Sequence, residues 1–397
     1  MGEVPAGRIL RFMGTEPALV VAENEIAAQV YGRPGDYERT EGKSMRQEFN
    51  GGVGMTKVVV AGPVEGAEWV AYVNAHPAST FAHLWPWKRI FETACSHRTF
   101  YLMAVRDSLV CGVLPLVLQK STLFGSFLTS MPFLNSGGIL ADDTEAERAL
   151  LRKAEELTQG SGAKYLQLRH RDHYTLPLRA LTHKVSPVKR ISADVDSMFS
   201  ELDKKVRTDI RKARSYGLTA SPEGSRALSE FYGLYVENMR RLGTPSYGLK
   251  LYREILRAFD DIAEIVVVRY GDTAVAASFL LRYRDSVEAL WSASRADFLH
   301  MKPNMLLYWE NLCLAARLGC KHFDFGRSTR NSGTHKFKQQ WGTQDVQLHW
   351  GQWPELQGDV AELSPANPRY HTAIQVWKRL PLLFTRTAGP YIARKLP

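Results

Sequence analysis

Residues 321–342 of the chain, KHFDFGRSTRNSGTHKFKQQWG, carry the most informative pattern in the sequence. They predict a short strand, then a loop rich in glycine and serine, then a helix. Aromatic residues alternate with Asp324 in the strand, and four basic residues follow it. In an open α/β sheet, ligands usually bind where a strand ends and the next loop begins. The segment therefore predicts an α/β fold and the position of a functional site.

Length and composition describe a globular protein with a substantial core. The chain has 397 residues, of which 45% are hydrophobic, and this length predicts two or three domains. No segment approaches the run of about 18 apolar residues that suggests a membrane span. The first residues lack a basic start followed by an apolar run, so we do not expect a signal peptide. We predict a cytoplasmic protein, with the inner face of the membrane as an alternative location.

The four cysteines and the net charge limit the kinds of site and partner that we expect. None of the cysteines forms a CxxC pair or has a histidine at metal-ligand spacing, so we predict reduced core thiols and no metal. The formal net charge of +10 favours an anionic partner. Candidates are a nucleotide, a tRNA, a phosphorylated lipid carrier and an anionic membrane surface. A solvated basic surface without a partner is the alternative.

The two ends of the chain differ in composition from the rest. Residues 1–54 are rich in glycine and charge and have weak periodicity, which predicts a poorly ordered extension and a folded protein that begins near Met55. Residues 356–397 form a basic tail in which Trp377, Leu382 and Phe384 lie among basic residues. This mixture is typical of a segment at a membrane surface. Packing of the tail against its own domain is the alternative.

Between these ends, the same order of elements occurs twice. Each half predicts a β-hairpin followed by a further strand. A helix then leads directly into a short strand: residues 144–160 precede AKYLQLRH, and residues 303–319 precede CKHFDFGR. The two short strands align without a gap, so we predict a tandem duplication of one α/β unit. The predicted domains are residues 55–185 and 186–355.

The second half contains a basic helix and a broken helix. Residues 200–216, SELDKKVRTDIRKARSY, predict an amphipathic helix whose polar face is either a phosphate-binding surface or a solvated face. Residues 239–248, MRRLGTPSYG, break a helix at Gly243 and Pro245. They form either an ordinary loop or a loop over a cleft. The candidate binding residues of these two segments are Lys204, Lys205, Arg207, Arg211, Arg241 and Tyr247.

Four runs of this sequence resemble a known family. The runs KKVRTDIRKA, MRRLGTP, PNMLLYWE and FDFGRSTRNSGTHKFKQQWG occur in the order and with the spacing of FemAB-like proteins. More narrowly, they resemble the branch associated with exosortase/PEP-CTERM surface sorting and exopolysaccharide systems. The last two runs are also similar to the BioF2-like acetyltransferase domain of the GNAT superfamily. The resemblance spans about residues 56–350 and is strongest in residues 200–350.

This resemblance implies a fold and a reaction class. The implied fold is α/β, with tandem GNAT-like (acyl-CoA N-acyltransferase) domains, each a mixed sheet flanked by helices. The implied reaction is acyl transfer to an amine, with no tightly bound cofactor. Fem ligases take an amino acid from aminoacyl-tRNA to a peptidoglycan precursor, and GNAT enzymes take the acyl group from coenzyme A. The narrower branch implies an acceptor in cell-surface polymers, lipid-linked or glycan-linked.

One motif helps to distinguish the two possible acyl donors, aminoacyl-tRNA and acyl-CoA. GNAT enzymes bind the pyrophosphate of coenzyme A with R/Q-x-x-G-x-G/A, where the fourth strand meets the next helix. Here that junction is ASRADFLHMKPNM and contains no glycine. A partial match, from Arg330 to His335, follows the next strand instead. The sequence therefore argues against a standard coenzyme A site, with an altered site as the alternative, and the predicted donor is aminoacyl-tRNA or acyl-CoA.

The candidate catalytic residues are Asp324 and Lys338. Asp324 lies between two phenylalanines, which favours a raised pKa, so it either accepts the amine proton or fixes the following loop. Lys338 matches a lysine of the family run that is expected to contact phosphate or the developing oxyanion. Replacing Lys338 by alanine is predicted to reduce turnover far more than stability. The other candidates for substrate binding are Arg327, Arg330, Tyr308 and Glu310, and His335 is either a proton shuttle or a solvated loop residue.

We predict an acyl- or aminoacyltransferase of FemAB/GNAT type that transfers the acyl group directly to an amine. The second half carries the site, because the first-half strand YLQLRH lacks the aspartate and the glycine of FDFGRS. One alternative is an acyl-CoA-dependent N-acyltransferase acting on a sugar amine. Another is a catalytically inactive GNAT-like module that binds anionic glycans or assembles a surface-export complex. Peripheral membrane contact through the tail is a further prediction, and the sequence predicts no oligomeric state.

Overall fold

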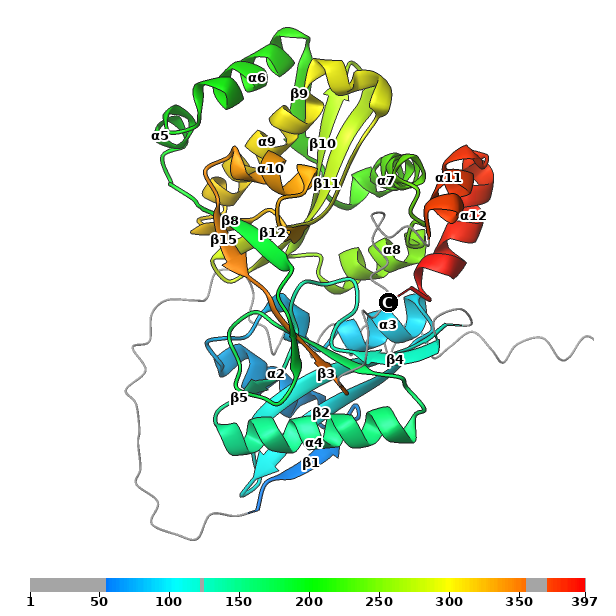
Figure 1. Ribbon diagram of the computed structural model, residues 1–397. Helices are drawn as coiled ribbons and strands as arrows, with labels where there is room; N and C mark the ends of the chain where they lie inside the picture. Colours follow the sequence, from blue (N-terminus) through cyan, green and yellow to red (C-terminus); the bar gives the residue numbers. More distant parts are fainter. Residues whose placement is uncertain (1–54, 122–124, 355–369, 397) are drawn as a thin grey trace, which may run out of the picture. The chain divides into compact units, whose positions relative to one another are not determined.

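The computed structural model describes residues 55–121, 125–354 and 370–396. These residues form two mixed β-sheets with helices on their faces (Figure 1). The predicted extension, residues 1–54, and residues 356–369 of the predicted tail lie outside the described residues.

The first sheet has the strand order β1-β2-β3-β4-β6-β16-β7, and β5 pairs with β3. Its first four strands are antiparallel neighbours, whereas β4 and β6 are parallel. Helix α4 packs on β2 and β3 and buries its apolar side chains there. The elements are β1 (Lys57–Val60), α2 (Gly66–Ala75), α3 (Trp87–Ala94), β2 (Arg98–Arg106), β3 (Leu109–Ser121), β4 (Gly125–Thr129), β5 (Leu140–Ala141), α4 (Thr144–Gly160), β6 (Leu166–His170), β7 (Arg179–Leu181) and β16 (His349–Trp353).

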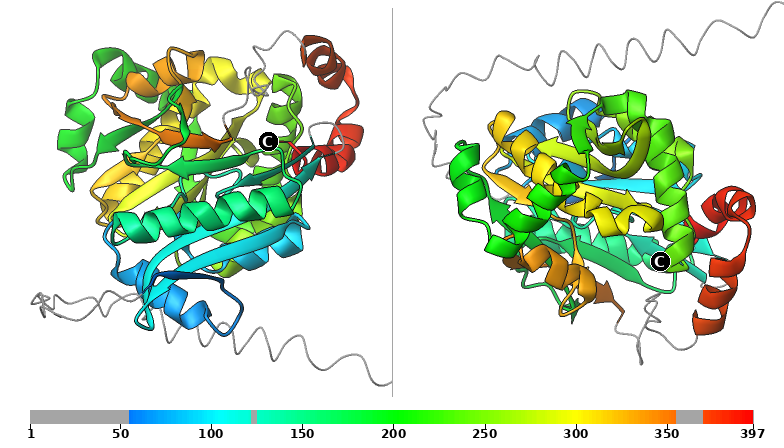
Figure 2. Two further views of the ribbon diagram at one scale, coloured as in Figure 1. Left: turned by 60° about the horizontal axis from the view of Figure 1, so that its bottom comes forward. Right: turned by 90° about the horizontal axis from the view of Figure 1, so that it is seen from above.

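The second sheet has the order β14-β8-β13-β12-β11-β10-β9, and β15 pairs with β8. Helix α9 packs on one face with α6 beside it, and α7 packs against β11 and β12 (Figure 2). The strands are β8 (Lys184–Arg190), β9 (Leu218–Pro222), β10 (Ala263–Tyr270), β11 (Thr273–Tyr283), β12 (Ser286–Ser294), β13 (His322–Asp324), β14 (Ser328–Thr329) and β15 (Gln344–Gln347). The helices are α5 (Val195–Ser200), α6 (Lys204–Ser215), α7 (Leu228–Leu242), α8 (Leu249–Ala258), α9 (Pro303–Arg317) and α10 (Gly333–Gln339).

The two halves repeat one topology, as the sequence predicts. In each half a strand and two helices precede an antiparallel hairpin, a third antiparallel strand, a helix and a parallel strand. The turns of the two hairpins have positive φ angles, 50° at Asp107 and 55° at Gly271. Helix α4 has the predicted bounds. The α/β tandem fold predicted from the sequence is therefore confirmed.

The halves also exchange strands, which the sequence does not predict. Strand β8, from the connection between the halves, pairs with β13 of the second sheet. Strand β16, from the end of the second half, returns to pair with β6 of the first. The structure thus differs from the predicted domain limits, because the limit at residue 185 falls inside β8 and β16 belongs to the first sheet. Both exchanged strands satisfy a strand edge that β6 or β13 would otherwise expose.

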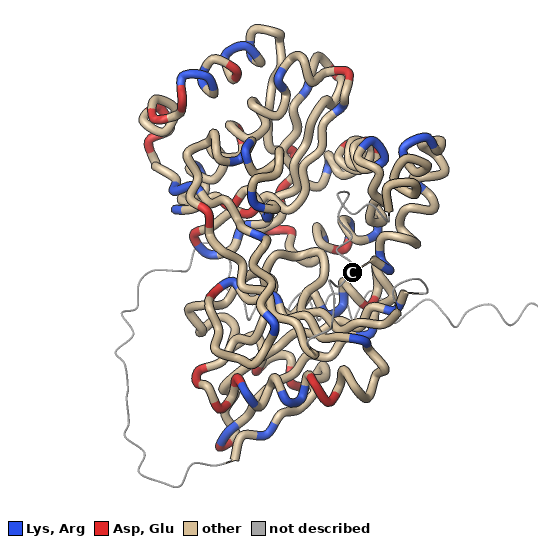
Figure 3. Tube along the Cα trace, in the orientation of Figure 1, with Lys and Arg blue, Asp and Glu red and all other residues tan. Residues whose placement is uncertain are grey.

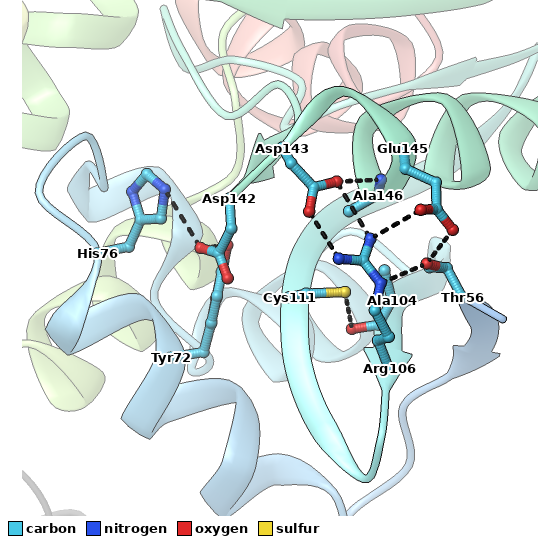
Figure 4. Close-up of polar contacts among 10 residues, drawn as sticks. All are labelled: Thr56, Tyr72, His76, Ala104, Arg106, Cys111, Asp142, Asp143, Glu145 and Ala146. Atoms are coloured by element: carbon cyan, nitrogen blue, oxygen red, sulfur yellow. Dashed lines mark hydrogen bonds and ion pairs between the residues drawn. The ribbon is translucent and has the colours of Figure 1, made fainter. Parts of the chain in front are cut away.

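A cluster of charged residues fixes the start of α4 against the first hairpin (Figure 4). Asp143 is the N-cap of α4 and accepts a hydrogen bond from the backbone N–H of Ala146 at 2.9 Å. The guanidinium of Arg106, at the end of β2, pairs with Asp143 at 2.7 Å and with Glu145 at 3.4 Å. Arg106 lowers the pKa of Asp143 to about 2. This cluster supports the scaffold and lies in the half that is predicted to be structural.

Several smaller predictions can be compared with the structure. All four cysteines are free and buried, as predicted for core thiols. The predicted basic helix begins at Lys204 rather than at residue 200. Residue 200 ends a separate short helix, α5, and a few non-helical residues separate it from α6. Among the described residues, no helix is long and apolar enough to cross a membrane. The same residues contain no group of three or more His, Cys, Asp or Glu side chains suited to a metal ion.

The described part of the tail forms two helices that pack on α7. They are α11 (His371–Arg379) and α12 (Leu382–Ala393) (Figure 1). The guanidinium of Arg240, on α7, donates a hydrogen bond of 2.6 Å to the carbonyl oxygen of Leu380 between them. These residues of the tail therefore pack on the protein's own domain, which is one of the two arrangements expected from the sequence.

Candidate active site

Strands β12 and β13 separate soon after they meet. They pair over three residues only, from Ser286 with His322 to Glu288 with Asp324. Strand β13 then ends, whereas β12 continues to Ser294 and has a bulge at Leu290 in its pairing with β11. A bulge bends its strand and increases the local twist. We call this opening, between residues 288–292 and residues 324–327, the fork.

Glycine is required where the chain leaves β13 at the fork. Gly326 has a φ of 75°, a backbone conformation that costs little only for glycine. A Cβ atom at this position would lie 2.6 Å from the carbonyl oxygen of Ala289 on β12. The backbone N–H of Gly326 donates a hydrogen bond of 2.8 Å to Oδ1 of Asp324. Asp324 therefore fixes the following loop, which is one of the two roles predicted for it.

Glu288 and Asp324 form a pair of buried carboxyl groups, the carboxyl pair, at the base of the fork. Glu288 is 8% exposed and accepts a hydrogen bond from Nδ2 of Asn135, in the first half of the chain. Asp324 accepts one from the hydroxyl of Ser186 on β8. Burial, followed by the negative charge of Asp324, raises the pKa of Glu288 to about 8. Burial also raises the pKa of Asp324, as the sequence predicts.

A cavity of about 50 Å³ lies beside the carboxyl pair and is lined from both halves. It has room for a small polar group such as an amine or a water. Tyr283 borders it, and its hydroxyl lies 2.9 Å from the hydroxyl of Ser79 in the other half. The residues with polar side chains that line the cavity include Ser79, Thr80, Asn135, Arg171, Ser186 and Tyr283.

Lys338 supports the fork from behind rather than facing a ligand. Its side chain is buried, and its ammonium donates hydrogen bonds of 2.7 Å to the carbonyl oxygen of Gly326 and 3.1 Å to that of Arg327. Burial lowers the pKa of Lys338 to about 8. The predicted contact with phosphate or an oxyanion is not what this geometry provides, because the ammonium already holds the loop.

Arg327 belongs to a cationic pair with Arg169. Its guanidinium and that of Arg169, on β6, both donate to the carbonyl oxygen of Leu134, at 3.2 and 2.9 Å. Both also lie over the ring of Trp350, 5.4 and 4.5 Å from its centroid. In the described part of the chain, neither forms an ion pair with a carboxylate. Burial, and then Arg327, lower the pKa of Arg169 to about 9.

Tyr247 connects this cationic pair to a second, larger cavity. Its ring centroid lies 4.3 Å from that of Phe133, and its phenol partly offsets the lowering by burial of the pKa of both guanidinium groups. It also borders a cavity of about 290 Å³ that α8 and α12 line. The predicted position of Tyr247 over a cleft therefore agrees with the structure.

The other predicted binding residues lie away from the carboxyl pair or are already engaged. Within the described chain, no residue of α6 lines either cavity, so Lys204, Lys205, Arg207 and Arg211 are not brought to the fork. Figure 3 shows that basic residues predominate along their helix, α6. Arg241 donates to the side chain of Asn238 at 2.7 Å. Glu310 forms an ion pair of 2.6 Å with Arg317 on its own helix.

The remaining candidates, on α9 and after β13, also make contacts within the protein. Tyr308 stacks on Phe325, with ring centroids 5.2 Å apart, and thus supports the fork from α9. Arg330 is half-exposed and lies 3.6 Å from Asp345. His335 is 1% exposed and lies 2.8 Å from the same carboxylate. The prediction of a solvated loop histidine is therefore wrong, and the pairing with Asp345 explains its burial.

The sequence reasoning missed Glu288, Asn135, Ser186 and Arg169. One signal was present: Glu288 stands in the strand SVEALWSAS, where apolar and small residues surround a single acid. Had that strand been placed beside β13, the register would have set Glu288 opposite Asp324. Asn135 and Ser186 come from distant segments and carry no such local signal.

The chain is similar to one protein-family model and to several solved structures. Residues 201–339 match the family model described as an acetyltransferase (GNAT) domain, and no curated protein matches the chain. The solved structure of FemX aligns with a TM-score of 0.56 and 16% identity over 74% of this chain and 96% of FemX. The structure of L-PGS from Bacillus licheniformis gives a TM-score of 0.49 and 12% identity, over 80% of this chain and 97% of that one. A tandem GNAT protein from the clavulanic acid biosynthesis pathway gives 0.48 and 9%, over 75% and 98%.

These matches concern the fold of the chain and the segment of residues 201–339. The chain has an α/β fold with tandem GNAT-like units, and it shares that fold with FemX. The matched segment includes the fork and the carboxyl pair, and it supports an acyltransferase. Asn135 and Ser186 lie outside it.

Proposed function

We propose that this protein is an N-acyltransferase in which Glu288 removes a proton from the acceptor amine. The carboxyl pair carries this proposal, because it places a base with a pKa near neutrality beside a small polar cavity. An ordinary surface carboxyl, with a pKa near 4.5, would hold a proton too weakly to take one from an ammonium group.

The proposed reaction proceeds by direct attack. Glu288 accepts a proton from the ammonium form of the acceptor, and the neutral nitrogen attacks the carbonyl carbon of the donor. A C–N bond forms as the C–O bond of an aminoacyl ester, or the C–S bond of a thioester, breaks. The leaving oxygen or sulfur takes up a proton, and the second proton of the amine is released. Burial raises the pKa of the described cysteine thiols Cys95 and Cys313 to about 12, which disfavours a covalent thioester on either.

Asp324 and the cationic pair have separate proposed roles. After burial, the negative charge of Asp324 further increases the proton affinity of Glu288, because two adjacent carboxylates repel each other, and this makes Glu288 a stronger base toward the amine. Arg327 has donors that the Leu134 carbonyl does not use, and we assign it to an anionic group of a substrate. Lys338 positions both residues by holding the intervening loop.

For the substrates, we propose an acyl group delivered to a cell-envelope or exopolysaccharide precursor. The sequence resemblance to the exosortase/PEP-CTERM-associated branch supports this acceptor class. The missing glycine-rich turn between β12 and α9 favours an aminoacyl-tRNA donor over acyl-CoA. The exposed basic face of α6 is a surface to which tRNA phosphates would bind.

The test compares the two donors directly. Calorimetric titration with acetyl-CoA, and filter binding of aminoacyl-tRNA, would be measured for the native chain, for Arg327→Gln and for Glu288→Gln. We expect tRNA binding that Glu288→Gln retains, together with acyl transfer that it abolishes. Micromolar binding of acetyl-CoA with transfer to a sugar amine would favour the coenzyme A alternative. Equal binding by all three proteins with no transfer to any amine would indicate an inactive binding module.

A further inference from the structure

The C-terminal helix α12 presents apolar side chains to solvent. Thr385, Gly389 and Ala393 recur every four residues and are buried. The opposite face carries Leu383, which is 75% exposed, and Tyr391, which is 64% exposed. A helix on the surface of a globular protein normally has the reverse arrangement, with apolar residues inward and polar residues outward. The exposed apolar side chains of the two tail helices are Val376, Leu382, Leu383, Phe384, Tyr391 and Ile392.

Small residues explain how α12 can pack with this orientation. A Cβ atom at Gly389 would lie 3.0 Å from the hydroxyl oxygen of Ser246, in the loop after α7. The inner face is therefore held by close contact of backbones rather than by large apolar side chains. The large apolar side chains are left for the outer face, which no other described residue covers.

The charge of the same segment has one sign. Residues 370–396 contain five lysines and arginines and no aspartate or glutamate. Lys378 and Arg379 end α11, Arg386 lies within α12, and Arg394 and Lys395 follow its C-terminal end (Figure 3). Two of the side chains lie beside aromatic rings, since the guanidinium of Arg394 is 5.0 Å from the ring of Tyr391 and that of Arg386 is 5.6 Å from Tyr232. Basic groups around an exposed apolar face are typical of helices that lie in the interface of an anionic membrane.

We propose that α11 and α12 dock this protein on an anionic lipid bilayer, with Leu383, Phe384 and Tyr391 in the interface. Charge complementarity selects this occupant. A second copy of the chain would bring five positive charges against five, which opposes a symmetric dimer on this face. The proposal does not depend on the reaction, because neither the carboxyl pair nor the fork takes part in it.

The test is co-sedimentation of the full chain with vesicles. One set is phosphatidylcholine alone, and the other contains phosphatidylglycerol as about a third of its lipid. We expect binding to the anionic vesicles that weakens with salt, and much weaker binding to the neutral ones. The double variant Leu383→Ser/Phe384→Ser should lower the partition coefficient by roughly tenfold or more. The matched control is Leu109→Ser, a 72% exposed leucine at the first hairpin, which should leave binding unchanged.

Four outcomes would overturn the proposal. Equal binding to both vesicle types, or an unaltered partition coefficient in the double variant, would exclude docking by this face. A dimer in sedimentation velocity that the double variant converts to monomer would show that a second copy covers it. Vesicle binding that appears only in a chain beginning at Met55 would show that residues 1–54 cover it in the full protein. Thermal melting of each variant establishes that these exposed substitutions leave the fold intact.

Discussion

The two halves of the molecule share a topology and differ at one pair of positions. In the first half, the parallel strands β4 and β6 set Thr129 opposite Gln167. In the second half, β12 and β13 set Glu288 opposite Asp324. Each pair is the last before the strands part. The first half therefore has a neutral pair where the second has two carboxyl groups.

The backbone after each pair differs as well. In the first half, the N–H of Ser130 bonds to the carbonyl oxygen of Gln167 at 2.9 Å, and that of Gly138 bonds to Arg169 at the same distance, so the chain itself closes the opening. In the second half, Gly326 occupies the place of Arg169, two residues beyond the pair. The first half thus closes its opening with its own backbone, whereas the second half keeps the fork.

The largest expected effect is on catalysis. Glu288→Gln keeps the acceptor for Asn135 but removes the base, so we expect acyl transfer to fall by about 10²–10⁴-fold. The matched change in the first half, Thr129→Val, alters a buried side chain of similar size at the equivalent position. It should leave the rate within about twofold of the native value. If both variants lost activity equally, the assignment of the site to the second half would be wrong.

The second effect is on stability. Lys338→Met removes the donor to the carbonyl oxygens of Gly326 and Arg327, and should lower the free energy of unfolding by about 2–3 kcal/mol. Lys336→Met, an exposed change two residues away, should stay within about 0.5 kcal/mol. Urea denaturation measures both. This expectation replaces the sequence-based one, in which loss of Lys338 affects turnover far more than stability.

A third comparison uses two glycines of similar conformation. Gly326 and Gly319 have φ angles of 75° and 69°, but only Gly326 has a backbone atom where a Cβ would lie. Gly319→Ala should cost about 1 kcal/mol for its φ angle alone. Gly326→Ala should cost about 1–3 kcal/mol more, because β12 must move. Thermal unfolding would show the difference. Equal losses of stability in the two variants would mean that β12 can move away from residue 326 at little cost.

The fourth effect is a pH dependence of stability. The native protein holds a proton on Glu288 up to about pH 8, whereas the unfolded chain releases it near 4.5. The contribution of this group to stability is therefore complete below 4.5 and is lost as the pH rises through about 8. Glu288→Gln cannot titrate, so its stability should rise relative to the native protein across this window. Parallel curves for the two proteins would contradict the raised pKa.

The smallest effect is a displacement of the pH–rate profile. The negative charge of Asp324 raises the pKa of Glu288, after burial, so Asp324→Asn should move the rising limb of the rate to lower pH. Asparagine retains an acceptor for the N–H of Gly326, and the loop should remain in place. An unchanged limb with a reduced plateau would show that Asp324 acts on the loop alone.

Much of the scaffold follows from the sequence because its signals are local. Apolar segments joined by a short turn predict each hairpin, and the run of residues 144–160 predicts a helix with the bounds that α4 has. The exchange of β8 and β16 does not follow, because pairing between strands so far apart in the chain leaves no mark within either one. The predicted domain limits differ from the sheets for this reason.

The site was predictable only in part. Asp324 and Gly326 stand in a recognisable run, and their roles at the fork agree with it. Glu288 depends on a register between two strands that only the folded sheet fixes. The sequence around Lys338 predicts a positive charge but not whether a ligand or a backbone carbonyl receives it. The environment of a charge is a property of tertiary structure.

The exchanged strands determine which part of the gene encodes the complete carboxyl pair and its partners. Ser186 reaches Asp324 from β8, and Asn135 reaches Glu288 from the first half. Neither residue lies in the matched segment, 201–339, so a gene fragment that encodes only that segment would lack both partners of the carboxyl pair. Replacing one half alone would therefore remove contacts on which the carboxyl pair depends. For recombination, the two interlaced halves behave as one unit.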